Sequence, residues 1–163
     1  MIDDEMERAA RNLLETLRSR GQMVATAESC TGGLIVAALT AIAGSSDVVD
    51  RGFVTYSNAA KAQMLGVPAS VIEAHGAVSA AVAQAMAEGA LARSDAALAV
   101  SVTGVAGPGG GSAEKPVGTV WFGLASLADP VHTERQLFPG DRAAIRHATV
   151  LHALKMLASI PRA

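Results

Sequence analysis

Apolar side chains recur at steps of three or four between residues 2 and 17 of the chain. Charged residues fill the positions between them, so one face of a helical wheel is apolar and the rest is polar. This period predicts an amphipathic helix that ends at Gly21, because glycine is favoured just past the end of a helix. The residues of the apolar face are Ile2, Met6, Ala10, Leu13 and Leu17.

The rest of the chain alternates β-like runs with helical patterns as far as residue 103, and two β-like runs then follow without a helix between them. Runs rich in β-branched residues predict strands, and Ser, Asp, Asn or Pro before an apolar pattern predicts the start of a helix. The expected strands are 22–29, 48–57, 95–104, 117–126 and 131–138. The expected helices are 34–42, 59–66 capped by Asn58, 68–75 opened by Pro68, 80–93 capped by Ser79, and a last one capped by Asp141.

This order of elements predicts an α/β fold, a three-layer α/β/α sandwich around a mixed, mostly parallel sheet of about five strands. No repeat or shift in composition divides the chain, so we expect one domain over residues 1–163. Ligands of such sheets bind outside the carboxyl ends of the strands. Three unusual loops follow predicted strands, and we expect them to converge: "AESCTGG" (27–33), "TYSNAAK" (55–61) and "TGVAGPGGG" (103–111).

Composition narrows the classes of function. The net charge of −2 gives no overall electrostatic reason to bind nucleic acid or an anionic membrane. The acidic N-terminus does not resemble a signal peptide, and no apolar stretch reaches the roughly 18 residues of a membrane span. A single cysteine is compatible with a reducing compartment, and no His, Cys and carboxylate spacing matches a metal site. We therefore expect a soluble cytoplasmic protein without a metal.

The first loop offers two adjacent nucleophiles, Ser29 and Cys30. If a helix begins near Thr31, its unpaired amides and positive end favour negative charge there, on a phosphate or on an oxyanion. Gly32 and Gly33 allow another group to approach the backbone closely. The alternative is structural, because Ser and Thr cap helices and a glycine pair permits tight packing.

Cys30 is the more reactive residue type, because a helix N-terminus lowers the pKa of a thiol. A cysteine hydrolase also needs a base, typically histidine. None of the four histidines lies in a loop that the pattern places near residue 30. A lone cysteine is more often a small buried apolar residue. A structural role for Cys30 is therefore the alternative to a catalytic one.

The second loop supplies a different base, Lys61. With Asn58 as the cap, Lys61 falls in the first turn of a helix, where the dipole disfavours its charge and lowers its pKa. Such an amine can accept the proton of a serine, as in Ser-Lys hydrolases. Tyr56 ends the preceding strand and can orient the amine or pass a proton. A solvated lysine and a tyrosine at the rim of the sheet are the alternative.

The third loop carries glycines at 104, 107, 109, 110 and 111 but matches neither the P-loop nor the dinucleotide fingerprint. It can form a nest of backbone amides that binds an anion, or simply a flexible connection. Arg142 and Arg146 lie four residues apart at the start of the last predicted helix. Two guanidinium groups there suit a phosphate or a carboxylate, and a solvated face paired with Asp141 or Glu134 explains them equally well.

Six segments, in their order and spacing, resemble the CinA C-terminal domain family. They are "ESCTGG" (28–33), "YSNAAKAQMLGV" (56–67), "HGAVS" (75–79), "TGVAGPGGG" (103–111), "KPVGTVWFGLA" (115–125) and "GDRAAIR" (140–146). The resemblance extends from about residue 5 to 158. Many members carry this domain behind a larger N-terminal domain. The resemblance includes no counterpart of that larger domain in this sequence, so we expect a stand-alone form. Val105 stands where isoleucine is frequent in the family, a change that should not alter the chemistry.

The resemblance implies an amidohydrolase. The family includes nicotinamide-nucleotide amidohydrolases, which convert nicotinamide mononucleotide to nicotinate mononucleotide and ammonia in pyridine-nucleotide salvage. Its proposed catalytic residues fall on Ser29 as nucleophile, Lys61 as its partner, Tyr56 and Thr103. The candidate substrate-binding residues are Thr31, Gly32, Gly33, Asn58, Gly104, Gly107, Gly109 and Arg142. The resemblance also implies a three-layer α/β/α fold, a small-molecule nucleotide as substrate, no cofactor, and a homodimer or higher homo-oligomer.

Two other functions stay open. A noncatalytic nucleotide-binding regulatory module, connected to competence and DNA damage by family names, would bind the nucleotide without releasing ammonia. A thiol hydrolase would use Cys30 and would be inactivated by iodoacetamide or by Cys30→Ala.

Overall fold

The computed structural model describes residues 1–161, and its centre is a five-stranded sheet in the order β2-β1-β3-β4-β5. β1 pairs in parallel with β2 and β3, whereas β4 runs antiparallel to both of its neighbours, β3 and β5. The sheet is therefore mixed, with β4 alone running against the other strands, which confirms the predicted class. The strands are β1 (Val24–Glu28), β2 (Val49–Val54), β3 (Leu98–Gly104), β4 (Thr119–Ser126) and β5 (His132–Leu137).

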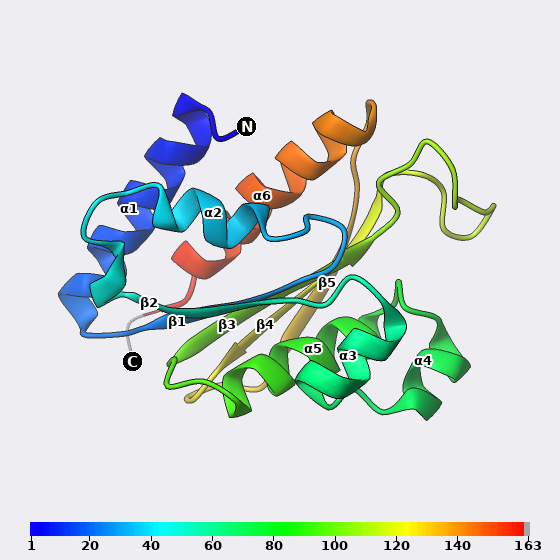
Figure 1. The fold of residues 1–163 in the computed structure, drawn as a ribbon, viewed down its shortest axis with the longest axis horizontal. Helices are drawn as coiled ribbons and strands as arrows, with labels where there is room; N and C mark the ends of the chain where they lie inside the picture. Colours follow the sequence, from blue (N-terminus) through cyan, green and yellow to red (C-terminus); the bar gives the residue numbers. More distant parts are fainter. Residues whose placement is uncertain (162–163) are drawn as a thin grey trace.

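Helices cover both faces of the sheet and complete three layers (Figure 1). One face carries α1 (Asp4–Arg20), α2 (Leu34–Thr40) and α6 (Arg142–Ala158). The other face carries α3 (Asn58–Leu65), α4 (Ala69–His75) and α5 (Ala80–Ala92). A short 3-10 helix, Ser45–Asp47, leads into β2. The predicted sandwich is confirmed, and the single domain over 1–163 stays a prediction, with residues 162–163 outside the described part.

The apolar patterns are buried as their periods predict. On α1, the face that includes Met6, Leu13 and Leu17 is at most 1% exposed and packs in the larger core cluster. Along β3, Val100 and Val102 point into this cluster and Ala99 points into a smaller one beneath α5. β3 is thus covered on both faces, as expected for a central strand of such a sheet.

One predicted helix start is confirmed and one predicted cap is wrong. α2 begins at Leu34, as the expected range 34–42 has it, and not near Thr31, because Gly32 and Gly33 take positive φ angles of 59° and 98° and form a turn. α3 is capped by Ser57 and not by Asn58, since the Ser57 hydroxyl accepts from the amide of Ala60 at 3.0 Å.

The other predicted caps are confirmed. The side chains of Ser79 and Asp141 cap α5 and α6, and Pro68 precedes α4. Within residues 1–161, no helix combines the length and apolar character that crossing a membrane requires.

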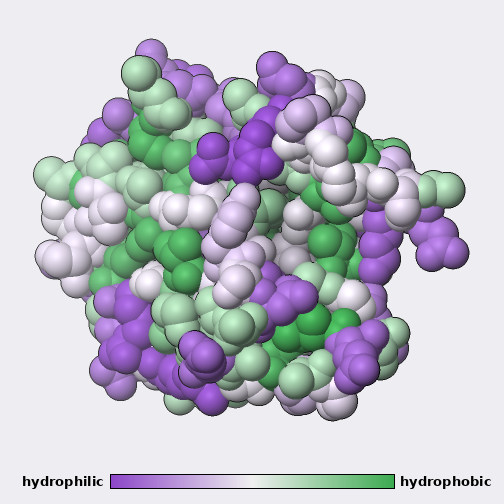
Figure 2. Space-filling model, turned by 45° about the vertical axis from the view of Figure 1, so that its right-hand side comes forward, coloured by the Kyte–Doolittle hydropathy of each residue, from purple (hydrophilic) through white to green (hydrophobic). Residues whose placement is uncertain are grey.

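The connections define one end of the sheet. α2 joins β1 to β2 over one face, and α3, α4 and α5 join β2 to β3 over the other. The chain therefore leaves the carboxyl end of β1 at a topological switch point, where such sheets form ligand sites. The glycine-rich loop after β3 extends beyond the strands at this end (Figure 1). Figure 2 turns this side toward the viewer and shows hydrophilic and apolar residues interspersed in small groups.

Candidate active site

A pocket of about 290 Å³ lies where the three loops meet. Residues that follow β1, β2 and β3 all contribute to it, so the expected convergence of the loops is confirmed. The lining residues are Ser29, Cys30, Tyr56, Asn58, Lys61, Ala77, Val78, Thr103, Gly104, Ala106 and Arg142.

Ser29 and Lys61 face each other in this pocket. The Lys61 amine donates to Ser29 Oγ over 2.9 Å and to the carbonyl oxygen of Thr55 over 3.1 Å. Ser29 is 8% exposed and Lys61 only 1% exposed, and within the described residues no carboxylate pairs with this lysine. An unpaired buried lysine is unfavourable when charged, so this position favours the neutral amine.

Local sequence accounts for both positions. Ser29 follows β1 directly, and its amide donates to Val102 of β3 at 3.1 Å, which ties the turn to the sheet. Because Ser57 caps α3, Lys61 lies at the end of the first turn, with its amide donating to Ser57. The side chain then extends back toward β1 beneath the strand ends.

The pKa of Lys61 is lowered from its ordinary value of 10.5, in the direction that the helix position predicted. The principal cause is burial of the amine, which the sequence argument had not used. A neutral amine has a lone pair, so at this distance it can accept the proton of the Ser29 hydroxyl. The 2.9 Å separation lies within the range over which a base can take the proton of a nucleophile.

The N-terminus of α2 is not free to bind an anion. The amides of Ile35 and Val36 donate to the carboxylate of Glu28 at 2.8 and 3.0 Å. The negative charge expected at this helix end is therefore supplied by the protein itself, and the expectation of unpaired amides there is wrong for these two positions. Glu28 is fully buried and does not line the pocket.

Cys30 lines the pocket and is itself buried. Burial raises its pKa from 9.0 to about 11, whereas the helix-end argument predicted a lower pKa. The difference arises because α2 begins four residues beyond Cys30 and its first amides are occupied by Glu28. Within the described residues no histidine lines the pocket, so Cys30 has no histidine base beside it there.

The Tyr56 hydroxyl is hydrogen-bonded to Arg142, and within the described residues no hydrogen bond joins it to Lys61. Its hydroxyl accepts from the Arg142 guanidinium at 3.1 Å, and the same guanidinium donates to the carbonyl oxygen of Gly107 at 2.8 Å. Tyr56 is 62% exposed, so its ring stands at the mouth of the pocket. Arg142 thus joins the second loop, the third loop and α6 across that mouth.

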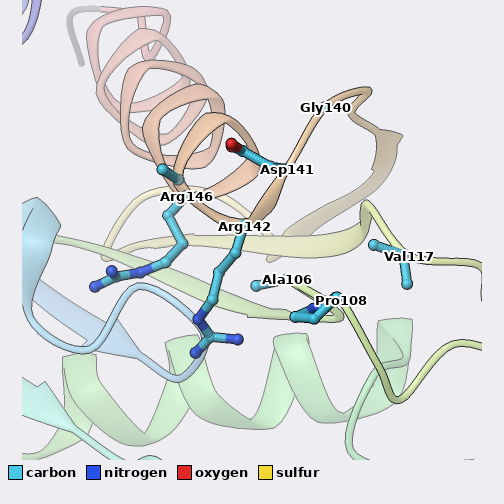
Figure 3. A pocket seen from close by; sticks show the side chains of 8 residues that line it. Ala106, Pro108, Val117, Gly140, Asp141, Arg142 and Arg146 are labelled. Carbon is cyan, nitrogen blue, oxygen red and sulfur yellow. The ribbon is translucent and has the colours of Figure 1, made fainter.

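A larger pocket of about 510 Å³ adjoins the first, and the two share Ala106 and Arg142. Arg142 extends from the start of α6 toward the third loop, where Pro108 and Val117 form the facing wall, whereas Arg146 extends toward the first loop (Figure 3). Arg146 donates to the carbonyl oxygen of Thr31 at 2.9 Å, and its Nε is buried without a partner in the described residues.

The remaining predicted residues divide into two groups. Thr103 lines the pocket, but its buried hydroxyl donates to the carbonyl oxygen of Ala77 at 2.8 Å and not to Ser29. Asn58 and Gly104 also line it. The other predicted binding residues do not line it and are Thr31, Gly32, Gly33, Gly107 and Gly109.

Sequence reasoning missed three lining residues, Ala77, Val78 and Ala106, and it weighed Cys30 only as a nucleophile or as a buried apolar residue. Ala77 and Val78 lie within the "HGAVS" segment, which carried the resemblance but no role, because neither side chain bears a reactive atom. Within residues 1–161, no group of three His, Cys, Asp or Glu side chains is arranged to hold a metal ion.

Comparison with known proteins gives close matches along nearly the whole chain. The chain is 50% identical over 157 residues to nicotinamide-nucleotide amidohydrolase PncC of Escherichia coli K12, covering 96% of this chain and 95% of that protein. It is 57% identical over 139 residues to the protein of the same name from Enterobacter agglomerans, covering 85% of each.

The fold matches as well. The crystal structure of competence/damage inducible protein CihA from Agrobacterium tumefaciens superposes with a TM-score of 0.95 at 52% identity, over 98% of this chain and 97% of that one. The family model described as CinA C-terminal domain matches residues 6–160. With the fold, the loop-lined pocket and these matches together, the chain belongs to the CinA C-terminal domain family.

Proposed function

We propose that this protein is a nicotinamide-nucleotide amidohydrolase that converts nicotinamide mononucleotide to nicotinate mononucleotide and ammonia. The activity follows from relatives of that name at 50% and 57% identity over most of the chain. The mononucleotide as substrate and the Ser29–Lys61 pair as catalyst are the specific parts of the proposal. The observation that carries them is the 2.9 Å contact between Ser29 Oγ and a buried Lys61 amine.

The first step is attack on the carboxamide. Neutral Lys61 takes the proton of the Ser29 hydroxyl, and Oγ forms a bond to the carboxamide carbon. The electron pair of the C=O bond moves to oxygen and gives a tetrahedral oxyanion. The carbonyl of Thr55, which accepts from Lys61 at 3.1 Å, holds the amine in place as its charge changes.

The oxyanion needs backbone donors within the pocket. In the turn after Ser29, the amides of Gly32, Ile35 and Val36 already donate within the protein. The amides of Cys30 and Ala106 are candidates, because both residues line the pocket, one from the first loop and one from the third. A hole at this place would use the first and third loops together.

Collapse of the intermediate releases ammonia. Lys61 returns its proton to the departing nitrogen, the C–N bond breaks, and the nicotinoyl group remains on Ser29 as an ester. Lys61 then takes a proton from a water molecule that attacks this ester, and it returns that proton to Ser29 Oγ as the ester C–O bond breaks. The products are nicotinate mononucleotide and the free serine, with Lys61 neutral again.

The phosphate end of the substrate suits Arg142 and the adjoining 510 Å³ pocket. Arg142 spans both pockets, and a guanidinium binds phosphate in a two-pronged manner. Because Arg142 holds Tyr56 and Gly107 in the structure, phosphate binding would replace or supplement these contacts. Asn58 and Gly104, which line the smaller pocket, are candidates for contacts to the ribose or the ring.

Ammonia release tests the proposal. Wild-type protein and Ser29→Ala are compared with nicotinamide mononucleotide as substrate and with free nicotinamide as the control. The proposal predicts release by the wild type alone, and much faster release from the nucleotide than from nicotinamide. Nucleotide binding without ammonia release by the wild type would instead indicate the noncatalytic regulatory module.

A further inference from the structure

Glu28 occupies an unusual position, because it is fully buried at the end of β1 and directly precedes Ser29. Its Oε1 accepts from the Thr31 hydroxyl at 2.6 Å and from the Ile35 amide at 2.8 Å. Its Oε2 accepts from the Val36 amide at 3.0 Å and from the Thr26 hydroxyl at 3.3 Å. All these partners donate, an arrangement that suits a carboxylate with its two acceptor oxygens.

The Glu28 carboxylate caps α2, although Glu28 lies at the end of β1 and not next to the helix in sequence. The N-cap residue of α2 is Gly33, which has no side chain to satisfy the first amides of the helix. Glu28 satisfies two of them and brings negative charge to the positive end of the helix. The α2 N-terminus is thereby fastened to the end of β1.

The same residue is tied to both members of the Ser29–Lys61 pair. Its side chain contacts Thr31, within the turn that carries Ser29. Its carbonyl oxygen accepts from the amide of Thr55 at 2.9 Å, and the Thr55 carbonyl in turn accepts from Lys61. Glu28 is therefore the residue through which the serine turn and the lysine's anchor are joined.

We propose that Glu28 is a positioning residue for the amidohydrolase reaction. By holding the turn from Ser29 to Gly33 against α2, its carboxylate keeps Ser29 Oγ at hydrogen-bond distance from Lys61. The inference rests on the proposed Ser29–Lys61 chemistry. It also explains why a carboxylate that has no cationic partner among residues 1–161 is buried directly beside Ser29.

Glu28→Gln is the informative substitution, because it preserves shape while replacing an acceptor oxygen with an NH₂ donor. The new NH₂ would face N–H or O–H donors, so the turn must shift. A displacement of about 1 Å at a reacting group costs roughly 100-fold in rate. We expect kcat for nicotinamide mononucleotide to fall by about that factor, while KM, which depends on the nucleotide contacts, changes less than about 3-fold.

Two threonines provide a matched pair of controls. Thr31→Val removes the hydroxyl that links the carboxylate to the serine turn, and Thr26→Val removes the hydroxyl that reaches the same carboxylate from within β1. We expect Thr31→Val to lower kcat by about 10-fold and Thr26→Val to leave it within about 2-fold. This pair decides the question if Glu28→Gln does not fold.

The experiment measures kcat and KM of the four proteins at a temperature where melting curves show each to be folded. Wild-type kcat in Glu28→Gln, an equal loss in both threonine variants, or a proportionate loss of binding and turnover would overturn the inference. If the wild type releases no ammonia, the proposed function fails by itself. The labelling rate of Ser29 by a fluorophosphonate probe then gives the same ordering if Glu28 positions the serine, and equal rates if it does not.

Discussion

Lys61 Nζ lies 2.9 Å from Ser29 Oγ, although the two residues are 32 positions apart, with Ser29 in the turn after β1 and Lys61 in α3. Ser29 leaves β1 toward α2, and Lys61 returns from α3 beneath the strand ends. The carboxyl end of the sheet therefore brings a hydroxyl and a buried amine together, and no histidine among the described residues lines their pocket. The predictions below follow from this contact and its surroundings.

Replacing the lysine should abolish catalysis while sparing the fold. Lys61→Met retains the length of the side chain and suits the buried site, but it cannot take a proton from Ser29. We expect kcat to fall about 1,000-fold or more, since general-base catalysis contributes roughly that factor. The rate of ammonia release at saturating substrate measures kcat. Lys155→Met, an exposed lysine on α6, is the matched control and should retain wild-type activity. A Lys61→Met protein with more than a tenth of wild-type activity would show that another group is the base.

The rate should rise with pH. Burial lowers the pKa of Lys61 below 10.5, and only the neutral amine accepts the serine proton, so kcat/KM should increase as pH rises through that lowered pKa. Measurements of kcat/KM from pH 5 to 10 test this increase. An activity that is highest at acid pH and falls toward neutrality would be incompatible with a neutral lysine base.

The lowered pKa of Lys61 should also make the free energy of unfolding depend on pH. Between the lowered pKa of Lys61 and 10.5 the unfolded chain binds more protons than the folded one, so this residue makes the free energy of unfolding rise with pH. Urea unfolding of wild type and Lys61→Met across this range isolates the effect. The slope with pH should be smaller in the variant, and equal slopes would show that Lys61 titrates normally in the folded protein.

Cys30 should be dispensable for catalysis. Burial raises its pKa to about 11, so at pH 8 only about 0.1% of the thiol is ionised and alkylation should be slow. We expect Cys30→Ala to retain activity within about 3-fold and to lose about 1 kcal/mol of unfolding free energy through the lost packing. Activity and iodoacetamide labelling of the folded protein are measured in parallel. Rapid labelling accompanied by inactivation would favour the thiol hydrolase.

Arg142 should govern affinity for the phosphate and not the chemistry. Loss of its charged hydrogen bonds in Arg142→Met should raise KM for nicotinamide mononucleotide roughly 10- to 100-fold with little change in kcat. The KM for nicotinamide riboside, which lacks the phosphate, should not change.

Tyr56→Phe removes only the hydroxyl that accepts from Arg142, and it should raise KM for the mononucleotide less than Arg142→Met does. Arg11→Met, an exposed residue of α1, is the control. An equal effect on both substrates would exclude Arg142 as the phosphate ligand.

Local pattern was sufficient for the layers of this fold. The apolar face of α1, the caps at Ser79 and Asp141, and the alternation of strands and helices each depend on neighbouring residues, and all were predicted. The meeting of Ser29 and Lys61 in one pocket also follows from topology, because loops after parallel strands gather at one edge. Their catalytic roles stay predictions.

The details that were missed depend on contacts between distant parts of the chain. The contacts of the Glu28 carboxylate were missed because its amide partners lie seven and eight residues away. Tyr56 was assigned to Lys61, but its partner Arg142 is 86 positions distant. No local period contains this information.

The most direct test of the Ser29 assignment is mass spectrometry of the protein quenched during turnover of nicotinamide mononucleotide. Because Ser29 and Cys30 are adjacent and share one tryptic peptide, the measurement is made in Cys30→Ala, with Ser29→Ala as the control. The Ser29–Lys61 mechanism predicts an acyl adduct on that peptide in Cys30→Ala and none in Ser29→Ala. An active Ser29→Ala protein, or an adduct that requires Cys30, would contradict it.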